Sequence, residues 1–516
     1  MSGAALMLSV SGVRGIVGAS LTPSVVTRFA GTVGAFVTER ANPSKIGADT
    51  IVYDAKPKAK KTRRPIVVLA RDGRFGGHVV RDAARAGLLS AGCDVIDIGV
   101  AMTPTCGVCV DSFDADAGMI ITASHNPQEW NGLKVLLREE KGRVSACAPN
   151  KSTADALIKR FQLASAAPAD QRAAGYSDAP LLRPWNEVGD SEDAGDEAIY
   201  AHAGQVTEAL TAMGILPRIA KAKLAVALDS VNGAGRVMTP GWLEGLGCKV
   251  HATGIDDSGL FPHTPEPTRE NLAAMTKNVK RVKAAVGFAQ DPDADRLALI
   301  DERGVYIGEE YTLVLATMAL GVLGALKKGS RLAVNLSTSR MIEDVAATFG
   351  CTVDRSAVGE ANVVQLMKDR KSPIGGEGNG GVIWPAVTYV RDSIGAMGLV
   401  LGLMAKSGKS LSQLVASTPS YAIEKRKVEL TRREEADTAQ NKIAKAFKKE
   451  RVDRQDGVRV DFAARRAWLH VRASNTEPIM RIIAEAPTKA DALALLAEAN
   501  AVIGLEPKAP VPAGIS

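Results

Sequence analysis

The first segment with residues suited to catalysis is AGMIITASHNPQEWNGLK, residues 117–134. Its apolar first half predicts a buried strand, so Ser124 falls in the polar turn at the strand end, where loops commonly carry functional side chains. His125 follows directly, and the Asn-Gly pair at 131–132 predicts a second turn that returns Lys134 toward the serine. A hydroxyl nucleophile, a possible base and a cation would then share one loop system. A serine that only caps a helix or stabilises a turn is the alternative interpretation.

A second segment, DPDADR, places Asp291, Asp293 and Asp295 at alternating positions between two apolar strands. In an extended chain this spacing aims the carboxylates to one side. Such a cluster repels itself unless a hard cation lies among the oxygens, and Mg²⁺ accepts few-carboxylate sites that a phosphate completes. An EF-hand is one alternative, but Arg296 stands where its loop requires glycine. A solvated acidic turn is another, although Arg296 suits a nearby phosphate.

The glycine-rich stretch GGEGNGG, residues 375–381, offers only two ligand-binding side chains, Glu377 and Asn379. Glycines permit close backbone approach, and a carboxylate beside an amide suits sugar hydroxyls. A plain tight turn explains the glycines equally well.

The stretch VRASNTEPIMR combines a guanidinium fork, hydroxyls and backbone donors in one turn, which predicts a phosphate cradle. Its four candidate residues are Arg472, Ser474, Asn475 and Thr476. Near the N-terminus, SGVRG presents a single cation, Arg14, between two glycines.

Three internal repeats must position these loops. Each repeat has an apolar run, a turn, a helical stretch and then a Gly-Cys pair that opens another apolar run. The Gly-Cys segments are AGCDV at 91–95, LGCKV at 246–250 and FGCTV at 349–353, and the leading apolar runs are 66–70, 224–228 and 332–336. Glycine is expected to end each helix in a left-handed conformation before a buried strand, so the chain contains three similar α/β domains.

The cysteines fit a reducing cytosol with no disulfide framework. Cys93, Cys248 and Cys351 occupy the same place in each repeat, where a small apolar side chain packs between helix and sheet. Cys106 and Cys109 form a C-x-x-C, for which redox or zinc chemistry is the alternative to an apolar helix start. No spacing suggests a partner for Cys147.

The last hundred residues differ from the repeats. Short alternating strands, VRVDF, AWLHVRA and MRIIAEA, precede an alanine-rich helix at about 488–503, which predicts a smaller α+β domain. Two polar stretches, 42–64 and 164–197, are expected to be solvent-facing insertions or connectors.

Length and charge exclude several classes of protein. A chain of 516 residues exceeds one compact domain, and 46% apolar residues make it globular. Of the net charge of +7, the segment 51–64 carries +5, so no broad basic surface for nucleic acid remains. The longest uncharged apolar stretch, 311–326, is too short for a membrane span. We therefore expect a cytoplasmic protein.

Together the segments resemble the α-D-phosphohexomutase family of phosphoglucomutases, phosphomannomutases and phosphoglucosamine mutases. The motifs S-G-V-R-G, T-A-S-H-N-P, D-P-D-A-D-R, G-E-G-N-G and R-A-S-N-T-E-P follow one another in the family's order over nearly the whole chain. The resemblance implies four domains around a central cleft, three similar α/β/α mixed-sheet domains plus a smaller α+β C-terminal domain. The expected ranges are 1–183 with the phosphoserine loop, 184–302 with the metal-binding loop, 303–422 with the sugar-recognition loop and 423–516 with the phosphate-binding loop.

The resemblance also implies a mechanism and a set of site residues. Ser124 would be phosphorylated in the active enzyme and would exchange its phosphoryl group with a hexose or hexosamine phosphate through a sugar 1,6-bisphosphate, which also serves as activator. Ser124, Asp291, Asp293 and Asp295 would hold Mg²⁺. Arg14, His125 and Lys134 would stabilise charge or move a proton, and the substrate would bind Arg296, Glu377, Asn379, Arg472, Ser474, Asn475 and Thr476. A monomer or homodimer without nucleic-acid or membrane partners is expected.

Two departures from the common motifs bear on the substrate. The family's sugar loop commonly reads G-E-x-S-G-H, whereas this chain has Asn379 and, in place of the histidine, Gly381. The segment SAVGEANVVQLM, with Glu360, is similar to the V-G-D/E segment of the phosphoglucosamine branch. The sequence therefore favours glucosamine phosphate. A phosphomannomutase/phosphoglucomutase is the alternative, and a non-catalytic sugar-phosphate-binding relative is a remote one.

Overall fold

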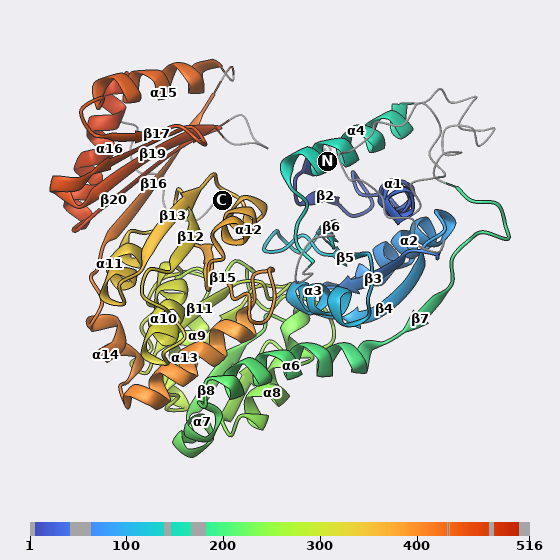
Figure 1. Ribbon diagram of the computed structural model, residues 1–516, viewed down its shortest axis with the longest axis horizontal. Coiled ribbons are helices and arrows are strands. Elements are labelled where there is room, and N and C mark those ends of the chain that lie inside the picture. The colour runs from blue at the N-terminus through green and yellow to red at the C-terminus, as the bar shows by residue number, and fades with distance from the viewer. Residues whose placement is uncertain are drawn as a thin grey trace.

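The computed structural model describes residues 6–41, 63–138, 146–166, 182–430, 432, 434–473 and 479–504. Its strands form four sheets of seven, four, four and five strands. Figure 1 shows the C-terminal sheet at the upper left, the first sheet at the right, strands of the third unit below the C-terminal sheet, and part of the second unit at the bottom. The predicted cradle residues Ser474, Asn475 and Thr476 lie outside the described residues, as do most of the basic insertion and part of the acidic connector.

The first sheet has helices on both faces. Its strands run in the order β1 (Met7–Ser9), β2 (Gly12–Ile16), β6 (Trp130–Leu137), β5 (Ala117–Ile121), β3 (Ile66–Arg71), β4 (Asp94–Val100) and β7 (Ser191–Asp193). One apolar cluster joins one face to α1 (Pro23–Ala41), α2 (Gly77–Ser90) and α4 (Lys151–Ala166), and another joins the opposite face to α3 (Thr103–Ser112).

The second and third sheets share one large core. The second sheet has the order β11 (Leu297–Asp301), β10 (Val286–Gln290), β8 (Ala225–Asp229) and β9 (Lys249–Thr253), and the third β13 (Thr352–Ser356), β12 (Arg331–Asn335), β14 (Gly375–Glu377) and β15 (Gly381–Ile383). Between and around them lie α6 (Gly195–Ala212), α7 (Leu216–Ala222), η2 (Ala234–Arg236), α8 (Thr239–Gly245), α9 (Ala273–Arg281), α10 (Glu310–Val322), α11 (Met341–Thr348), α12 (Glu360–Arg370), α13 (Ser393–Ser407) and α14 (Leu411–Ala416). The apolar α13 is buried along most of its length, and Asp392 caps its amino end.

The three sheets repeat one topology. The strand orders β4-β3-β5-β6, β9-β8-β10-β11 and β13-β12-β14-β15 are equivalent, with three parallel strands followed by one antiparallel strand. The glycines of the Gly-Cys pairs have φ of +83° at Gly92, +89° at Gly247 and +67° at Gly350, which confirms the predicted helix ends. The three predicted α/β units are therefore confirmed.

This topology places three of the candidate loops at equivalent points. Ser124 lies between β5 and β6, the acidic loop between β10 and β11, and the loop that follows Glu377 between β14 and β15. Each loop thus connects the third and fourth strands of its repeat. Residues that are far apart in the sequence acquire the same position in three successive domains.

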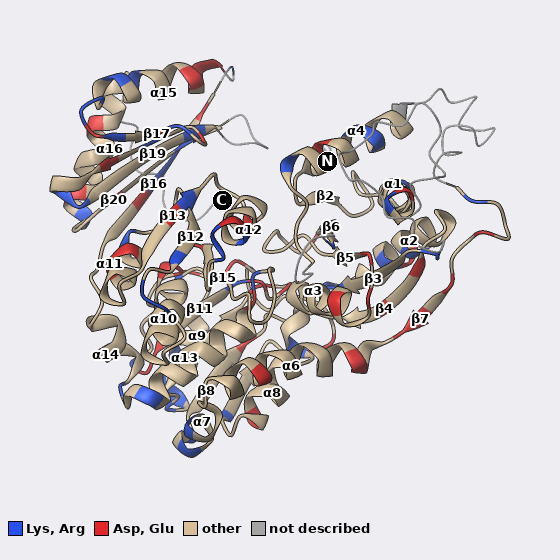
Figure 2. Cartoon of the chain, viewed as in Figure 1, with Lys and Arg blue, Asp and Glu red and all other residues tan. Residues whose placement is uncertain are grey.

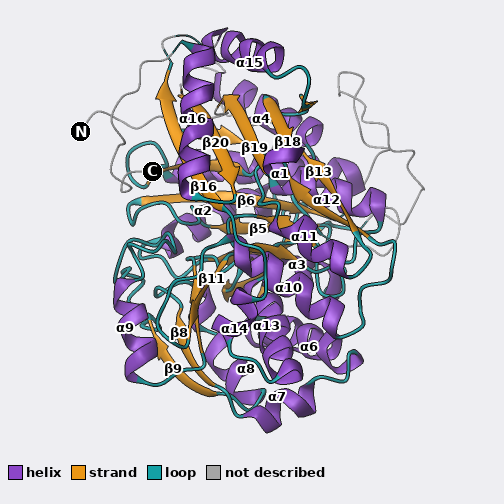
Figure 3. Ribbon diagram, turned by 90° about the vertical axis from the view of Figure 1, so that its left-hand side faces the viewer, coloured by secondary structure: helices purple, strands orange, loops and turns teal. Residues whose placement is uncertain are grey.

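The C-terminal sheet is antiparallel throughout. It has the order β16 (Ala422–Glu429), β20 (Ile479–Ala486), β19 (Ala467–Ala473), β18 (Val458–Phe462) and β17 (Arg451–Asp453), with η3 (Ala463–Arg465) before β19. Two helices, α15 (Glu434–Ala446) and α16 (Lys489–Ile503), share its apolar core, and Figure 3 shows them on one side of the sheet. The predicted α+β domain is confirmed.

The cysteines are packing residues in this fold. All six are buried thiols, and Cys106 and Cys109 lie within α3. Burial raises the pKa of Cys109 to about 12 and that of Cys106 well above its ordinary value, so both thiols stay protonated.

The described part of the connector follows the edge of the first sheet. Its strand β7 pairs with β4, and Figure 2 shows acidic residues along this segment. No helix among the described residues is long and apolar enough to cross a membrane.

Candidate active site

The Ser124 loop holds its serine in an unusual conformation. Ser124 has φ +52°, in the left-handed region, and is 1% exposed. Its backbone N–H donates to Thr122 Oγ1 at 2.8 Å. Its Oγ donates to Asp291 Oδ2 at 3.1 Å and lies 3.3 Å from His125 Nδ1. The hydroxyl of the first domain therefore meets a carboxylate of the second and an imidazole of its own loop.

The acidic loop gathers its carboxylates by a turn. Asp291, Asp293 and Asp295 each offer an oxygen within 4.8 Å of the others, and all three are 0% exposed. The prediction of an extended stretch is wrong, because residues 292–294 form a turn and Ala294 has φ +52°. The turn, not strand alternation, brings the three side chains together.

Lys134 reaches this acidic loop. Its Nζ donates to Asp293 Oδ2 and to Asp295 Oδ2, both at 2.7 Å. The prediction of a second turn at 131–132 is wrong, because those residues lie inside β6, and Lys134 pairs with Ile120 across the β5–β6 hairpin. The ammonium is thus directed from the strand to the carboxylates of the neighbouring domain.

Burial and charge set the protonation of these groups. Burial and the neighbouring Asp293 and Asp295 raise the pKa of Asp291 well above its ordinary value. Burial alone would raise the pKa of Asp295 too, but Arg391 and Lys134 outweigh it and lower that pKa. Although burial opposes the charged form, Asp293 and Asp295 raise the pKa of Lys134 above its ordinary value, so the ammonium stays charged.

His125 is kept neutral. Arg296, burial and Arg14 lower its pKa well below the ordinary value. An imidazole that is neutral near pH 7 can accept a proton, and this one lies within 3.3 Å of the Ser124 hydroxyl.

The acidic loop has two oxygens that suit a cation. Asp293 Oδ1 and Asp295 Oδ1 are buried and accept no hydrogen bond from any described residue. A buried carboxylate oxygen without a donor is costly unless another positive group meets it. Oxygen donors of this kind are those that Mg²⁺ prefers, so the residues present fit a divalent metal.

Two arginines flank the loops. Arg14 Nη1 donates to Asn126 Oδ1 at 3.0 Å, which ties the N-terminal hairpin to the serine loop. Arg296 Nε lies 4.0 Å from Asp291 Oδ2 and 3.9 Å from Asp295 Oδ1 and makes no hydrogen bond to a described residue. A guanidinium with such an uncommitted donor beside the serine can bind a phosphate oxygen.

The glycine-rich loop presents a held carboxylate. Glu377 Oε1 accepts from Asn335 Nδ2 at 2.8 Å, and Glu377 Oε2 accepts from Arg391 Nη1 at 2.9 Å. Asn379 Nδ2 lies 3.5 Å from the same Oε2. The predicted pair is therefore brought together and fixed in one orientation.

Sequence reasoning missed Arg391. Its guanidinium bonds Asp295 Oδ2 at 2.7 Å as well as Glu377, and its Nε lies 3.3 Å from Glu360 Oε2. It thereby joins the acidic loop of the second domain to two carboxylates of the third. One sequence feature could have identified it. Arg391 directly precedes Asp392, the cap of a buried apolar helix, and a buried arginine needs carboxylates as partners.

The C-terminal domain contributes Arg472 from β19. Its Nε lies 3.2 Å from Asp456 Oδ2, which also accepts from the backbone N–H of Val358 at 3.1 Å. The arginine therefore stands where the fourth domain meets the loop that precedes Glu360. The other predicted cradle residues lie outside the described part of the chain.

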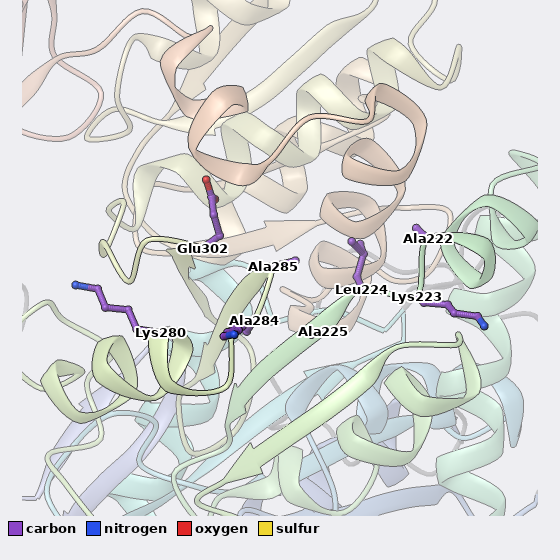
Figure 4. A pocket seen from close by; sticks show the side chains of 9 residues that line it. Ala222, Lys223, Leu224, Ala225, Lys280, Ala284, Ala285 and Glu302 are labelled. Carbon is purple, nitrogen blue, oxygen red and sulfur yellow. The ribbon is translucent and has the colours of Figure 1, made fainter.

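A separate cavity does not involve these residues. It has a volume of about 440 Å³ and is lined by Lys223, Ala225, Lys280, Lys283, Glu302 and their neighbours (Figure 4). Its wall includes the beginning of β8 and the residues before β10, whereas the acidic loop follows the end of β10. The cavity therefore lies at the amino ends of β8 and β10, whereas the acidic loop lies at the carboxyl end of β10.

Comparison with known proteins places the chain in a family. Models of the phosphoglucomutase/phosphomannomutase α/β/α domains I, II and III match residues 6–143, 205–304 and 308–421, and the model of the C-terminal domain matches residues 427–502. The chain belongs to the α-D-phosphohexomutase family. It is a phosphohexomutase, an isomerase of a family whose substrates are sugar phosphates.

Its relatives differ in name. A phosphoglucomutase/phosphomannomutase of Thermococcus kodakarensis is 34% identical over 93% of this chain and 94% of its own length. A probable phosphoglucosamine mutase of Methanopyrus kandleri is 31% identical over 93% of both chains. A crystal structure of a family protein from Burkholderia thailandensis superimposes with a TM-score of 0.72 at 22% identity, covering 96% of this chain and 98% of that one. That likeness supports the fold.

Proposed function

We propose that the protein is a phosphoglucosamine mutase that interconverts glucosamine 6-phosphate and glucosamine 1-phosphate. The observation that carries the choice of sugar is the loop of residues 375–381, which has Asn379 and Gly381 and no imidazole. The partly buried Glu360, linked to that loop through Arg391, supports it. A relative at 31% identity is named probable phosphoglucosamine mutase, while one at 34% is named phosphoglucomutase/phosphomannomutase.

In the proposed reaction Ser124 Oγ carries a phosphoryl group in the active form. Transfer breaks the bond from phosphorus to Ser124 Oγ and forms a bond to a hydroxyl of the sugar phosphate, which gives a sugar 1,6-bisphosphate. The sugar then turns, and its other phosphate returns to Ser124. The net change moves the phosphate between O6 and O1. Free sugar 1,6-bisphosphate phosphorylates Ser124 of the unphosphorylated enzyme by the second of these transfers.

Different residues are proposed to accept the proton and to stabilise the negative charge of the transferred phosphoryl group. The sugar hydroxyl loses its proton as the new bond forms, and the proposed acceptor is His125, whose neutral imidazole lies 3.3 Å from Ser124 Oγ. Lys134, held charged between Asp293 and Asp295, supplies fixed positive charge. Arg14 steadies the serine loop through Asn126, and Arg296 offers its free donor to the transferred phosphate.

A divalent metal, Mg²⁺ by the chemistry of the donors, would be held by the oxygens of Asp291, Asp293 and Asp295 together with the phosphate on Ser124. When bound it neutralises charge on the transferring group. Glu377 and Asn379 are proposed to hold the sugar hydroxyls. Arg472, together with Ser474, Asn475 and Thr476, is proposed to grip the phosphate that does not react.

A panel of substrates tests the proposal. Glucosamine 6-phosphate, glucose 1-phosphate and mannose 1-phosphate are compared by kcat/KM in coupled assays with Mg²⁺ and trace sugar bisphosphate. Glucosamine 6-phosphate should have the highest kcat/KM. If its kcat/KM is the lowest of the three, the protein is better assigned as a phosphomannomutase/phosphoglucomutase. The control is Ser124→Ala, which should be inactive on all three sugars. Equal, negligible turnover by both proteins and no phosphate in the intact mass would favour a non-catalytic sugar-phosphate-binding protein.

The domain ranges 1–183, 184–302, 303–422 and 423–516 remain our proposal.

A further inference from the structure

A buried arginine outside the proposed reaction grips the backbone of the serine loop. Arg74, in the turn between β3 and α2, is 1% exposed. Its Nη2 donates to the carbonyl of Ser124 at 2.7 Å, and its Nη1 donates to the carbonyls of Asn126 at 3.1 Å and Pro127 at 2.6 Å. One guanidinium thus binds carbonyls along the turn that carries the nucleophile.

Asp72 completes the grip from the other side of Ser124. Its carboxylate accepts from the backbone N–H of Arg74 at 3.0 Å, from Arg74 Nε at 3.3 Å and from Thr122 Oγ1 at 2.7 Å. Thr122 Oγ1 in turn accepts from the Ser124 N–H at 2.8 Å. Both the N–H and the C=O of Ser124 are therefore tied to the pair of Asp72 and Arg74.

This double attachment explains the backbone of the serine. A residue with a side chain rarely adopts φ +52°, and it does so stably only when its surroundings hold both flanking peptide groups. In that conformation Ser124 Oγ lies 3.1 Å from Asp291 Oδ2 of the second domain. A relaxed turn would direct the hydroxyl elsewhere.

The second domain closes over the same group. The ring of Phe261 stacks on the Arg74 guanidinium, with its centroid 4.8 Å from Cζ. The carbonyl of Gly259 accepts from the N–H of Phe75 at 2.8 Å and from Gln128 Nε2 at 3.1 Å, and the N–H of Phe261 donates to Gln128 Oε1 at 2.8 Å. One loop of the second domain thus binds both the turn that carries Arg74 and Gln128 at the end of the serine loop.

We propose that Asp72, Arg74 and Phe261 form a clamp that positions Ser124 for phosphoryl transfer across the boundary between the first and second domains. The clamp does not touch the hydroxyl itself, so its members are positioning residues. The inference rests on the proposed phosphoserine reaction for its readout, but it holds for whichever hexose phosphate is the substrate.

The clamp predicts a loss in rate rather than in binding. Arg74→Ala should lower kcat by roughly 10- to 100-fold, the effect of misplacing a reacting group by about 1 Å. The KM should change less than about twofold, because Glu377 and Arg472 lie in other domains and keep their contacts. Guanidinium ion at a concentration below that which unfolds the protein should restore part of the kcat.

The experiment measures the rate at which sugar 1,6-bisphosphate phosphorylates Ser124, followed by intact mass in a single turnover. The matched control is Arg459→Ala. Arg459 is equally buried, stacks on Trp468 at 4.4 Å, pairs with the carboxylate of Asp461 and donates to the carbonyl of Leu336, but it lies between the third and fourth domains. Its loss should lower the melting temperature without slowing phosphorylation of Ser124 by saturating bisphosphate.

A second variant keeps the test decisive if Arg74→Ala does not fold. Thr122→Val preserves the shape of the side chain but removes the link between Asp72 and the Ser124 N–H, and it too should slow phosphorylation. Wild-type rates in either folded variant, or equal slowing in the Arg459→Ala control, would overturn the clamp. A wild-type protein that no hexose bisphosphate phosphorylates would instead overturn the proposed function.

Discussion

Replacing Arg391 with methionine should destabilise the protein strongly. The guanidinium side chain is 8% exposed and meets Asp295 at 2.7 Å, Glu377 at 2.9 Å and Glu360 at 3.3 Å. Removing one partner of a buried ion pair costs about 3–5 kcal/mol, because the remaining charge is left without compensation. Here three carboxylates lose a shared counterion, so we expect a loss in that range.

Urea denaturation and thermal melting, followed by circular dichroism without added metal, measure this loss. A decrease of about 3 kcal/mol corresponds to a fall of roughly 6–12 °C for a cooperative unit of 150–250 residues. The control is Arg331→Met on β12, whose exposed ion pair with Asp354 should contribute less than about 1 kcal/mol.

The pH dependence provides an internal check. Burial raises the pKa of Glu360 above its ordinary value, and Arg391 opposes this rise, so removing Arg391 raises that pKa further. A carboxyl whose pKa is raised by folding stabilises the protein below its unfolded-state pKa of about 4.3 and loses this contribution as the pH rises through the folded value. The deficit of the variant should therefore be smaller at pH 5 than at pH 8. A melting temperature equal to that of the wild type at both pH values would refute the role of Arg391 as shared counterion.

Three further predictions follow from single residues. Asp293→Asn should preserve folding but abolish Mg²⁺-dependent turnover, which melting and activity assays check; turnover near the wild-type rate would exclude a metal on this carboxylate. Arg472→Ala should weaken substrate binding by about 1.5–3 kcal/mol, seen as a raised KM, since a charge-assisted phosphate contact is lost; an unchanged KM would remove Arg472 from the phosphate site. Burial lowers the pKa of His470 to about 4, so its neutral form stabilises the fold above the unfolded pKa of about 6.5. That contribution, at most about 3 kcal/mol, should fade between pH 6.5 and 4 in wild type but not in His470→Gln.

The repeated architecture was predictable because its signals are local. Glycine at 92, 247 and 350 ends a helix in the left-handed region, and the following cysteine packs against the sheet within the same few residues. The alternating pattern of the last domain likewise predicted strands 458–462 and 467–473 to the residue. Such features depend on neighbours in the chain, so the sequence alone suffices.

The contacts between residues of the site could not be predicted in this way, because their partners are distant in the sequence. Arg391 and Asp295 are separated by 96 positions, and Arg74 and Ser124 by 50. The first pair forms only when the second and third domains pack together, and the second only when the first domain has folded. The wrong expectation for residues 131–132 has a similar cause, because an Asn-Gly pair that favours a turn in isolation is held in β6 by pairing with β2. The carboxylates of residues 291–295 met through a turn that alternation did not predict.

The most direct test of the central proposal follows the phosphate on Ser124. Protein phosphorylated by sugar bisphosphate is mixed with glucosamine 6-phosphate and Mg²⁺, and intact mass and sugar products are measured over a single turnover. The proposal predicts that the protein loses its phosphate as glucosamine 1,6-bisphosphate forms, faster than with glucose or mannose phosphates, and that Ser124→Ala never takes up phosphate. Retention of the phosphate in the presence of every sugar phosphate would contradict it.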